Sequence, residues 1–270
     1  MPVWKGRQST LKTNYIRVLG SADWHQTKHN DHSCYTIDDQ LLIDACPGVV
    51  THLLDHGVEP LDVRVVCFTH MHCDHYMGLA PLLHYWRVCK NTKLGGLTII
   101  GPRATVRETV MRTLHFVFGS EEGVCACVTE MPQIIELEGD TQVDMLGYQI
   151  RVMDSDHAVP GLCYRITDRE TGHAIGLTGD TAYMPAFGTF FENVDLLVHE
   201  ASYGAGPADA VNPSRHSGAY EAAQVCKEAQ VKSLLLTHTY EPKREAALSE
   251  ARKQLTIPVQ WALPYEKFTY

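Results

Sequence analysis

The segment 69–75, which reads THMHCDH, constrains this chain more than any other feature of its sequence. It follows an apolar, β-branched run, VRVVCF, which is typical of a buried strand. Because side chains two apart on an extended chain point the same way, His70 and His72 can reach one cation. Asp74 and His75 then lie on the turn beyond, free to reach a second. Imidazole and carboxylate together suit Zn²⁺, Mn²⁺ or Fe²⁺, so the segment predicts a metal site at the end of a strand.

The rest of the chain alternates short β-rich runs with amphipathic stretches, a pattern typical of an α/β layered domain. Strands are predicted at Tyr15–Leu19, Ser33–Ile37, Gln40–Asp44, Val63–Thr69, Leu97–Ile100, Gln133–Leu137, Tyr148–Met153, Leu162–Thr167, Ala174–Thr178, Leu196–His199, Ser233–His238 and Val259–Trp261. Helices are predicted at Val49–His56, Leu79–Val88, Thr105–Phe118, Gly218–Ala229 and Arg244–Gln254. No Pro/Ser-rich linker or low-complexity tract interrupts this pattern, so residues 1–270 are predicted to form a single domain.

Charge and cysteine content narrow the functional classes. A net charge of −9 is atypical of proteins that grip long nucleic acids mainly through phosphate contacts, because that binding needs an excess of Lys and Arg. The one close cysteine pair, Cys125 and Cys127, lacks the second pair of a structural zinc site and is interpreted as packing or loop. No apolar run is near the roughly 18 residues that a membrane span needs, and no signal-peptide pattern opens the chain. A cytoplasmic location without membrane contact is therefore predicted.

Further short segments accompany the first motif in a fixed order. They are Leu42–Asp44, Asp156–Ile166, Gly179–Thr181, His199–Ser202, His216–Ala219 and Leu236–His238. Taken together, these segments resemble the metallo-β-lactamase superfamily, and within it the ribonuclease Z-like branch, from Tyr15 to about Tyr240. The resemblance implies a four-layer αββα fold, in which two mixed sheets pack face to face with helices outside. It also implies a metal-dependent hydrolase with a dinuclear metal site.

The resemblance further implies two divalent metal ions per chain, Zn²⁺ first, with Mn²⁺ or Fe²⁺ as alternatives. The implied ligands of one metal are His70, His72 and His157, those of the other are Asp74, His75 and His238, and Asp180 bridges them. A hydroxide between the two metals would attack phosphorus.

Supporting roles follow from the same resemblance. Asp74 would accept or steer the proton of that hydroxide. His216, held by Glu200, would contact the phosphate and help to protonate the leaving oxygen. Asp44 and His199 are implied to support the ligands from behind.

Two phosphodiester-cleaving activities compete for this site. The first is a phosphodiesterase for a small or cyclic phosphodiester of the cyclic-nucleotide type, like members of the branch that lack a substrate-gripping arm. The alternative is the transfer-RNA 3′-processing endonuclease, which carries a long Gly-rich and basic arm between the third and fourth motifs. Here only 22 residues separate His157 from Asp180, and a hairpin around 168–172 fills them. The sequence therefore favours a small substrate and keeps RNA as the alternative.

Other classes fit less well. A lactonase or thioesterase is a further alternative, although the elements at His199, Glu200 and His216 weigh against it. A class B β-lactamase would be exported and use a Cys ligand, and an oxygen-reducing di-iron protein would replace His72 with Glu. A non-catalytic interaction protein is disfavoured because every ligand position is filled.

Three surface features carry further expectations. A homodimer is predicted from two helical apolar faces, formed by Leu79, Leu82, Leu83 and Trp86 and by Val106, Val110, Thr113 and Leu114. A basic rim beside the cleft could be formed by Lys90, Lys93, Arg103, Arg107 and Arg112. The loop after the first strand, which the resemblance places near the cleft, is interpreted as solvated, although one of its three histidines could touch substrate. These histidines are His25, His29 and His32.

Overall fold

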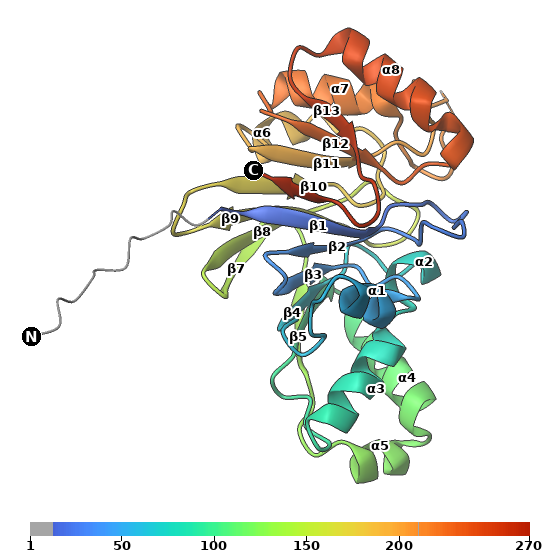
Figure 1. Cartoon of the computed structure of the whole chain (residues 1–270), viewed down its shortest axis with the longest axis vertical. Coiled ribbons are helices and arrows are strands. Elements are labelled where there is room, and N and C mark those ends of the chain that lie inside the picture. Colours follow the sequence, from blue (N-terminus) through green and yellow to red (C-terminus); the bar gives the residue numbers. More distant parts are fainter. Residues whose placement is uncertain (1–12, 210) are drawn as a thin grey trace, which may run out of the picture.

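The computed structural model describes residues 13–209 and 211–270, and within them two mixed sheets of seven strands each pack face to face (Figure 1). The first sheet has the order β14-β1-β2-β3-β4-β5-β6, at Lys267–Thr269, Tyr15–Gly20, Cys34–Ile37, Leu41–Ile43, Val65–Cys67, Thr98–Pro102 and Gln133–Leu137. The second sheet has the order β13-β12-β11-β10-β9-β8-β7, at Val259–Trp261, Leu234–Thr237, Leu196–Glu200, Ala174–Leu177, Leu162–Asp168, Tyr148–Asp154 and Thr141–Met145.

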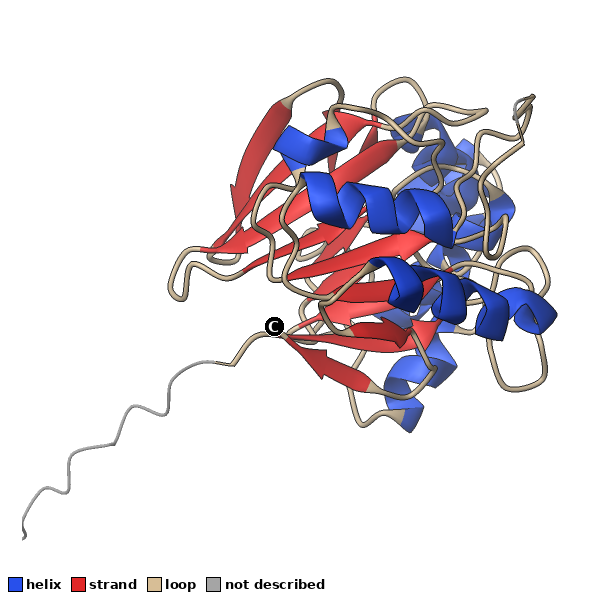
Figure 2. Cartoon of the chain, turned by 90° about the horizontal axis from the view of Figure 1, so that it is seen from above, coloured by secondary structure: helices blue, strands red, loops and turns tan. Residues whose placement is uncertain are grey.

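Helices cover the outer face of each sheet, which gives the order helix, sheet, sheet, helix (Figures 1 and 2). On the first sheet lie α1 (Val49–Asp55), α3 (Leu79–Cys89), α4 (Val106–Phe118) and α5 (Glu121–Cys127). On the second sheet lie α6 (Phe187–Phe190), α7 (Ala219–Glu228) and α8 (Arg244–Gln254). Two short elements are α2 (Cys73–Tyr76) and the 3₁₀ turn η1 (Glu241–Lys243). This is the predicted four-layer αββα fold.

Three hydrophobic cores fill the spaces between the layers. Val65 and Cys67 of β4 face the core between the sheets, whereas Val66 between them faces the core beneath α1, α3 and α4. In β11, Val198 faces the shared core and Leu197 faces the core beneath α6, α7 and α8. Burial on both faces explains why these strands read as continuous hydrophobic runs.

Parallel pairing brings the carboxyl ends of several strands to one edge. β3 to β6 pair in parallel in the first sheet, as do β10 to β13 in the second. Several hydrogen bonds join the sheets there, and two of them reach the backbone that follows β4. The Leu162 N–H donates to the Thr69 carbonyl at 2.7 Å, and the Tyr164 hydroxyl donates to the Phe68 carbonyl at 2.6 Å. The segments that follow β4, β10 and β12 are therefore held close together, as is common for sites in α/β proteins.

The predicted helices and strands are confirmed to within two residues at each end. Five elements were not predicted: β7, β14, α2, α5 and α6. β7 is a partly exposed, polar strand, and the other four elements are short. The turn predicted for Asp74 and His75 is in fact α2, and Cys125 and Cys127 lie in α5. The first 12 residues of the predicted domain 1–270 lie outside the described residues. Among the described helices, none has the length and apolar character to cross a membrane.

The two apolar faces that predict a homodimer are buried inside the chain itself. Every residue of these faces is at most 8% exposed, namely Leu79, Leu82, Leu83 and Trp86 of α3 and Val106, Val110, Thr113 and Leu114 of α4. These side chains cover the first sheet and cannot also form an interface. The homodimer remains a prediction, and these faces do not support it.

Candidate metal centre

The first motif turns away from β4 and folds its polar side chains inward. Because β4 ends at Cys67, His70 and His72 lie on the loop beyond the strand rather than on its last residues. Asp44 holds this loop, since its carboxylate accepts hydrogen bonds from the Thr69 N–H at 2.7 Å and the Thr69 hydroxyl at 2.8 Å. His70 Nε2 lies 3.0 Å from His72 Nδ1. The two imidazoles converge as predicted, but through a loop.

The short helix α2 supplies the second pair of donors from this motif. Asp74 and His75 both lie on it, and His75 is 1% exposed. His75 Nδ1 lies 2.8 Å from Asp44 Oδ2, and His75 Nε2 lies 3.7 Å from Asp74 Oδ2. Asp44 therefore lies behind the imidazole, where its contact with Nδ1 leaves Nε2 facing the site.

Three further donors come from three separate turns of the second sheet. His157 lies between β8 and β9, Asp180 follows β10, and His238 follows β12. Gly179 has φ +58°, and a Cβ there would lie 2.7 Å from the Cβ of Thr69. Only glycine lets this turn approach the first motif so closely, and that approach delivers Asp180 to the site.

The donor atoms form two adjoining groups. One group contains His70, His72, His157 and Asp180, and the other contains Asp74, His75 and His238, with all donors of a group within 4.8 Å of one another. Asp180 Oδ2 lies 3.4 Å from His238 Nε2, 3.5 Å from His75 Nε2 and 3.7 Å from His70 Nε2. Asp180 therefore lies between the groups, and the grouping matches the one that the resemblance implies.

The outer nitrogen of these imidazoles is engaged by the protein. His238 Nδ1 lies 2.9 Å from the Ser202 hydroxyl oxygen, and His70 Nδ1 lies 3.1 Å from the Thr69 hydroxyl oxygen. His157 Nδ1 lies 3.3 Å from a backbone carbonyl oxygen. Such contacts fix the ring so that Nε2 points into the site.

Two of the inner nitrogens, in contrast, lack hydrogen-bond partners. Nε2 of His75 and of His238 are both buried without a hydrogen-bond partner, a costly arrangement that a cation would relieve. Burial, reinforced by the charge of His75, holds the pKa of His70 well below its usual range, so this imidazole stays neutral as a ligand must. Burial would raise the pKa of Asp180, but His238 and His75 hold it well below its usual range. The residues present fit divalent metal ions.

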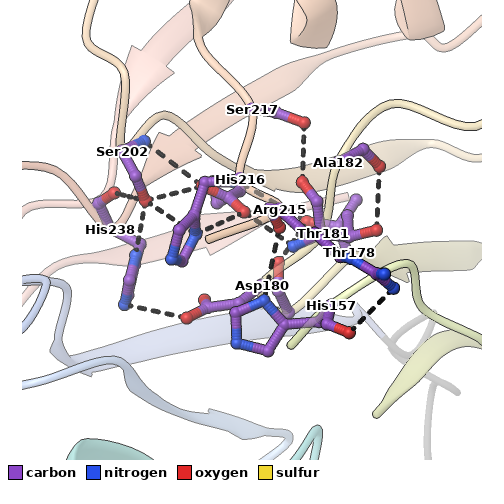
Figure 3. A network of polar contacts seen from close by, with 12 residues as sticks. His157, Thr178, Asp180, Thr181, Ala182, Ser202, Arg215, His216, Ser217 and His238 are labelled. Atoms are coloured by element: carbon purple, nitrogen blue, oxygen red, sulfur yellow. Dashed lines mark hydrogen bonds and ion pairs between the residues drawn. The ribbon is translucent and has the colours of Figure 1, made fainter. Parts of the chain in front are cut away.

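A second polar network lies beside the donor groups and includes His216 (Figure 3). His216 Nδ1 lies 3.0 Å from Glu200 Oε1, which also accepts a hydrogen bond from the Thr181 N–H at 2.6 Å. Burial disfavours the charged form of His216, but the Glu200 carboxylate outweighs it and raises the pKa of His216 to about 9. The His216 ring lies 5.0 Å from the His157 ring. A protonated imidazole therefore borders the donor groups at neutral pH.

Ser202 connects this network to the donors (Figure 3). Its hydroxyl donates to Glu200 Oε2 at 2.6 Å and lies 2.9 Å from His238 Nδ1. Neither Ser202 nor Thr69 is among the predicted site residues. In the sequence, each of them is marked only by being a hydroxyl residue within two positions of a predicted site residue. That pattern is too common to identify a functional residue.

His199 is not brought to the donor groups, although it is expected to support them. Because successive residues of a strand face opposite sides, Glu200 faces the site and His199 faces the helices. The His199 ring packs 6.4 Å from the Phe187 ring, and its Nδ1 lies 2.8 Å from the Glu200 carbonyl oxygen. The structure therefore corrects this role, and His199 is a buried packing residue of the outer core.

The site opens on one side into a cavity of about 590 Å³. His216 and His238 line its inner end, and Trp24, Tyr240 and Lys243 line its outer wall. A separate cavity of about 500 Å³, lined by residues that include Phe116, lies on the helices of the first sheet. Of these two cavities, only the first is lined by His216 and by one of the donors, His238.

Known proteins share this sequence pattern and fold. A family model described as the Beta-lactamase superfamily domain matches residues 39–239. A ribonuclease Z of Thermoplasma acidophilum is 26% identical over 273 residues, covering 81% of this chain and 83% of the relative. The metallo-beta-lactamase fold protein YhfI from Bacillus subtilis has a TM-score of 0.78 at 22% identity and covers 96% of this chain and 100% of its own. The short form of human tRNase Z has a TM-score of 0.73 at 18% identity, covering 94% and 98%.

Proposed function

Because this chain belongs to the beta-lactamase superfamily and is a metal-dependent hydrolase of the phosphodiesterase type, we propose that its substrate is a small or cyclic phosphodiester, such as a cyclic nucleotide. The observation that carries the proposal is the position of Asp180 between two donor groups, with protonated His216 beside them. That arrangement suits cleavage of a phosphorus–oxygen bond. The small size of the substrate rests on separate observations.

The proposed cofactors are two divalent metal ions per chain, Zn²⁺ first, with Mn²⁺ and Fe²⁺ as alternatives. His70, His72 and His157 would hold one ion, Asp74, His75 and His238 the other, and Asp180 would contact both. When bound, the ions would supply Lewis-acid activation of water and of the phosphoryl group. Elemental analysis after reconstitution with Zn²⁺ or Mn²⁺ tests this proposal. Two metals per chain are expected, and one or none would contradict it.

The chain's own side chains handle the protons. Asp74 and His238 approach to 3.7 Å, and the imidazoles of His238 and His75 keep the Asp74 carboxylate ionised although burial opposes this. Asp74 can therefore accept or steer a proton from the attacking water. As the water oxygen bonds to phosphorus, the bond to the leaving oxygen breaks, and His216 donates its proton to that oxygen. Glu200 holds the His216 ring in place and keeps it charged.

Two observations favour a small substrate over RNA. Between β9 and β10, where the endonuclease would carry its arm, the chain makes a short turn at residues 169–173. Four of the five residues of the predicted basic rim pair with glutamates at 2.6 to 2.8 Å. These pairs are Lys93 with Glu130, Arg103 with Glu138, Arg107 with Glu136, and Arg112 with Glu108. The rim therefore offers little unpaired positive charge to a polynucleotide.

Ribonuclease Z activity remains the second candidate, because the named relative is a ribonuclease Z that matches most of both chains. One metal-loaded preparation should be given cyclic nucleotides, a precursor transfer RNA and a lactone at several salt concentrations. We expect the specificity constant for a cyclic nucleotide to exceed that for precursor transfer RNA by at least about tenfold. Salt-sensitive cleavage of transfer RNA at its 3′ side, with cyclic nucleotides left intact, would favour the endonuclease. Preferential turnover of the lactone would favour the lactonase or thioesterase alternative.

Two properties of the whole protein are also proposed. A homodimer would double the monomer mass in light scattering at micromolar concentration, and a monomeric mass would reject it. Its interface must lie outside the buried faces of α3 and α4. A cytoplasmic location is proposed from the cysteine usage, and cell fractionation tests it.

A further inference from the structure

Three aromatic rings line the outer part of the cavity that opens from His216 and His238. The Trp24 and His25 ring centroids lie 3.8 Å apart, and those of His25 and Tyr240 lie 4.9 Å apart. We call these three residues the aromatic wall. Trp24 is 72% exposed and Tyr240 is 42% exposed, so large apolar surfaces face solvent beside the reaction site. No fold requirement explains this exposure, because neither ring packs into one of the three cores.

The loop that carries Trp24 and His25 is anchored rather than loose, and Tyr240 of the wall lies two residues after His238. The Ala22 N–H donates to the Asp31 carbonyl at 3.0 Å, which pairs the two arms of the loop at its base. The Asp23 carboxylate accepts a hydrogen bond from the His25 N–H at 2.8 Å. The Ser21 carbonyl accepts one from the N–H of the predicted metal ligand His238 at 2.9 Å. These backbone hydrogen bonds tie the loop to itself and to the His238 backbone, so little ordering entropy would oppose binding at it.

Charge in the cavity points to an anionic ligand. Lys243 also lines it, and its ammonium donates to the Ser202 carbonyl at 3.4 Å. The Lys243 side chain is exposed and places positive charge on this wall, whereas the Asp23 carboxylate, which also lines the cavity, is buried and is engaged by the His25 N–H. The cavity therefore combines aromatic faces with the positive charge of Lys243.

We propose that the aromatic wall binds the ring of a nucleoside or aryl phosphodiester while its phosphate lies at the metal centre. This inference rests on the proposed function, and it narrows the substrate to phosphodiesters that carry a planar ring. Stacking of a base on an aromatic side chain is typically worth a factor of about 5 to 100 in affinity and tolerates different bases. Trp24 and His25 are thus specificity-determining residues. Lys243 attracts the negative charge of any phosphodiester, with or without a ring.

A binding experiment tests the wall without turnover. Adenosine 5′-monophosphate and ribose 5-phosphate share a phosphate and a ribose, but only the former has a base. We expect adenosine 5′-monophosphate to bind more tightly and to quench tryptophan fluorescence. Trp24→Phe should lose the quench and keep most of the affinity, whereas Trp24→Ala should bind the nucleotide about 5- to 100-fold more weakly. Both variants should leave the affinity for ribose 5-phosphate unchanged.

A kinetic experiment uses two esters with one leaving group, thymidine 5′-(p-nitrophenyl phosphate) and methyl p-nitrophenyl phosphate. Trp24→Ala should lower kcat/KM for the thymidine ester about 5- to 100-fold, because KM rises while kcat stays the same. The kcat/KM for the methyl ester should not change. Lys243→Met should lower both. Phe116→Ala is the matched control, because Phe116 is 84% exposed but lines the other cavity. It should change neither.

The outcomes separate this inference from the proposed function. If Trp24→Ala leaves the nucleotide affinity and the ester preference unchanged, the aromatic wall is overturned even though the chain is a phosphodiesterase. If the metal-loaded chain hydrolyses neither ester but Trp24→Ala still weakens nucleotide binding, the wall is supported and the proposed function is contradicted. If Phe116→Ala lowers kcat/KM for the thymidine ester as much as Trp24→Ala does, the proposed role of the aromatic wall is also contradicted.

Discussion

The two sheets contribute to the metal centre in different ways. The first sheet delivers four donors from residues 70–75, a single loop and helix held together by Asp44. The second sheet delivers His157, Asp180 and His238 from three turns that are far apart in the chain. One half of the site is therefore a local structure, and the other half exists only when the parallel strands of the second sheet are assembled. Their junction is Asp180, which lies within 3.7 Å of imidazoles from both halves.

Removing that junction should have the largest effect. Asp180→Ala deletes the one donor shared by both groups, so we expect metal content to fall from two per chain to none and hydrolysis to fall below detection. Asp156→Ala is a matched control, since Asp156 precedes His157 but pairs with exposed Arg215 at 3.0 Å. It should retain both metals. Retention of one metal by Asp180→Ala would mean that the local half binds an ion by itself.

A smaller effect is expected from His216, which belongs to the second half. We propose it as a proton donor rather than a metal ligand, and one of its ring nitrogens lies within 4.8 Å of donor atoms of Asp180 and His238. His216→Ala should keep both metals and lower kcat by about 10²- to 10⁴-fold, as loss of a general acid does. Elemental analysis and steady-state kinetics on one preparation measure both. Loss of the metals from this variant would show that His216 is a ligand or a structural support instead.

The pH profile tests how Glu200 acts on His216. Because the pKa of His216 is raised from 6.5 to about 9, its proton is present through neutral pH and is lost as the pH rises through about 9. In Glu200→Gln the alkaline fall in kcat should begin at lower pH, nearer 6.5. If the alkaline fall in kcat occurs at the same pH in Glu200→Gln, Glu200 does not raise the pKa of His216.

Asp44 tests the first half alone. Asp44→Asn keeps the size of the side chain but loses the charge beside His75, so metal affinity should fall about 10- to 100-fold. Competition with a chelator measures this change. The loss should be greater for the ion expected at Asp74, His75 and His238 than for the other ion. An equal loss of both ions would show that the first motif acts as one rigid unit.

The smallest effect is expected at Asp39, in the turn between β2 and β3. Burial alone would raise its pKa, but hydrogen bonds from Arg17 and Tyr15 lower the pKa from 3.8 to about 2. The ionised group therefore stabilises the fold above about pH 4, and this contribution, at most about 2 kcal/mol, is lost as the pH falls towards 2. In urea unfolding, Asp39→Asn should flatten this part of the acid dependence without changing metal content. A parallel loss of metal would couple this turn to the site.

The difference between the halves also explains what the sequence could predict. The donors at residues 70–75 follow from spacing, since they share one segment. The turns that bear His157, Asp180 and His238 have no local signature, and they could be predicted only because their order resembles a known family. The sequence marks His25 as one of three histidines that could touch substrate. Ser202 and the contact of His25 with Tyr240 could not be predicted, because these side chains meet their partners across separate loops. His199 was misassigned because a motif specifies neighbours in sequence, whereas strand alternation turns adjacent side chains to opposite faces.

The hydrogen bond between the Ser21 carbonyl and the His238 N–H has a consequence for the order of events during synthesis. Ser21 leaves the ribosome early, followed by the donors at residues 70–75, while His238 emerges near the end of translation. An ion bound at that stage would be held by an incomplete set of the predicted donors and would exchange with the cellular pool. Only when β12 docks beside β11 does the final ligand join the first loop of the chain. The complete set of predicted donors therefore exists only once the polypeptide is almost finished.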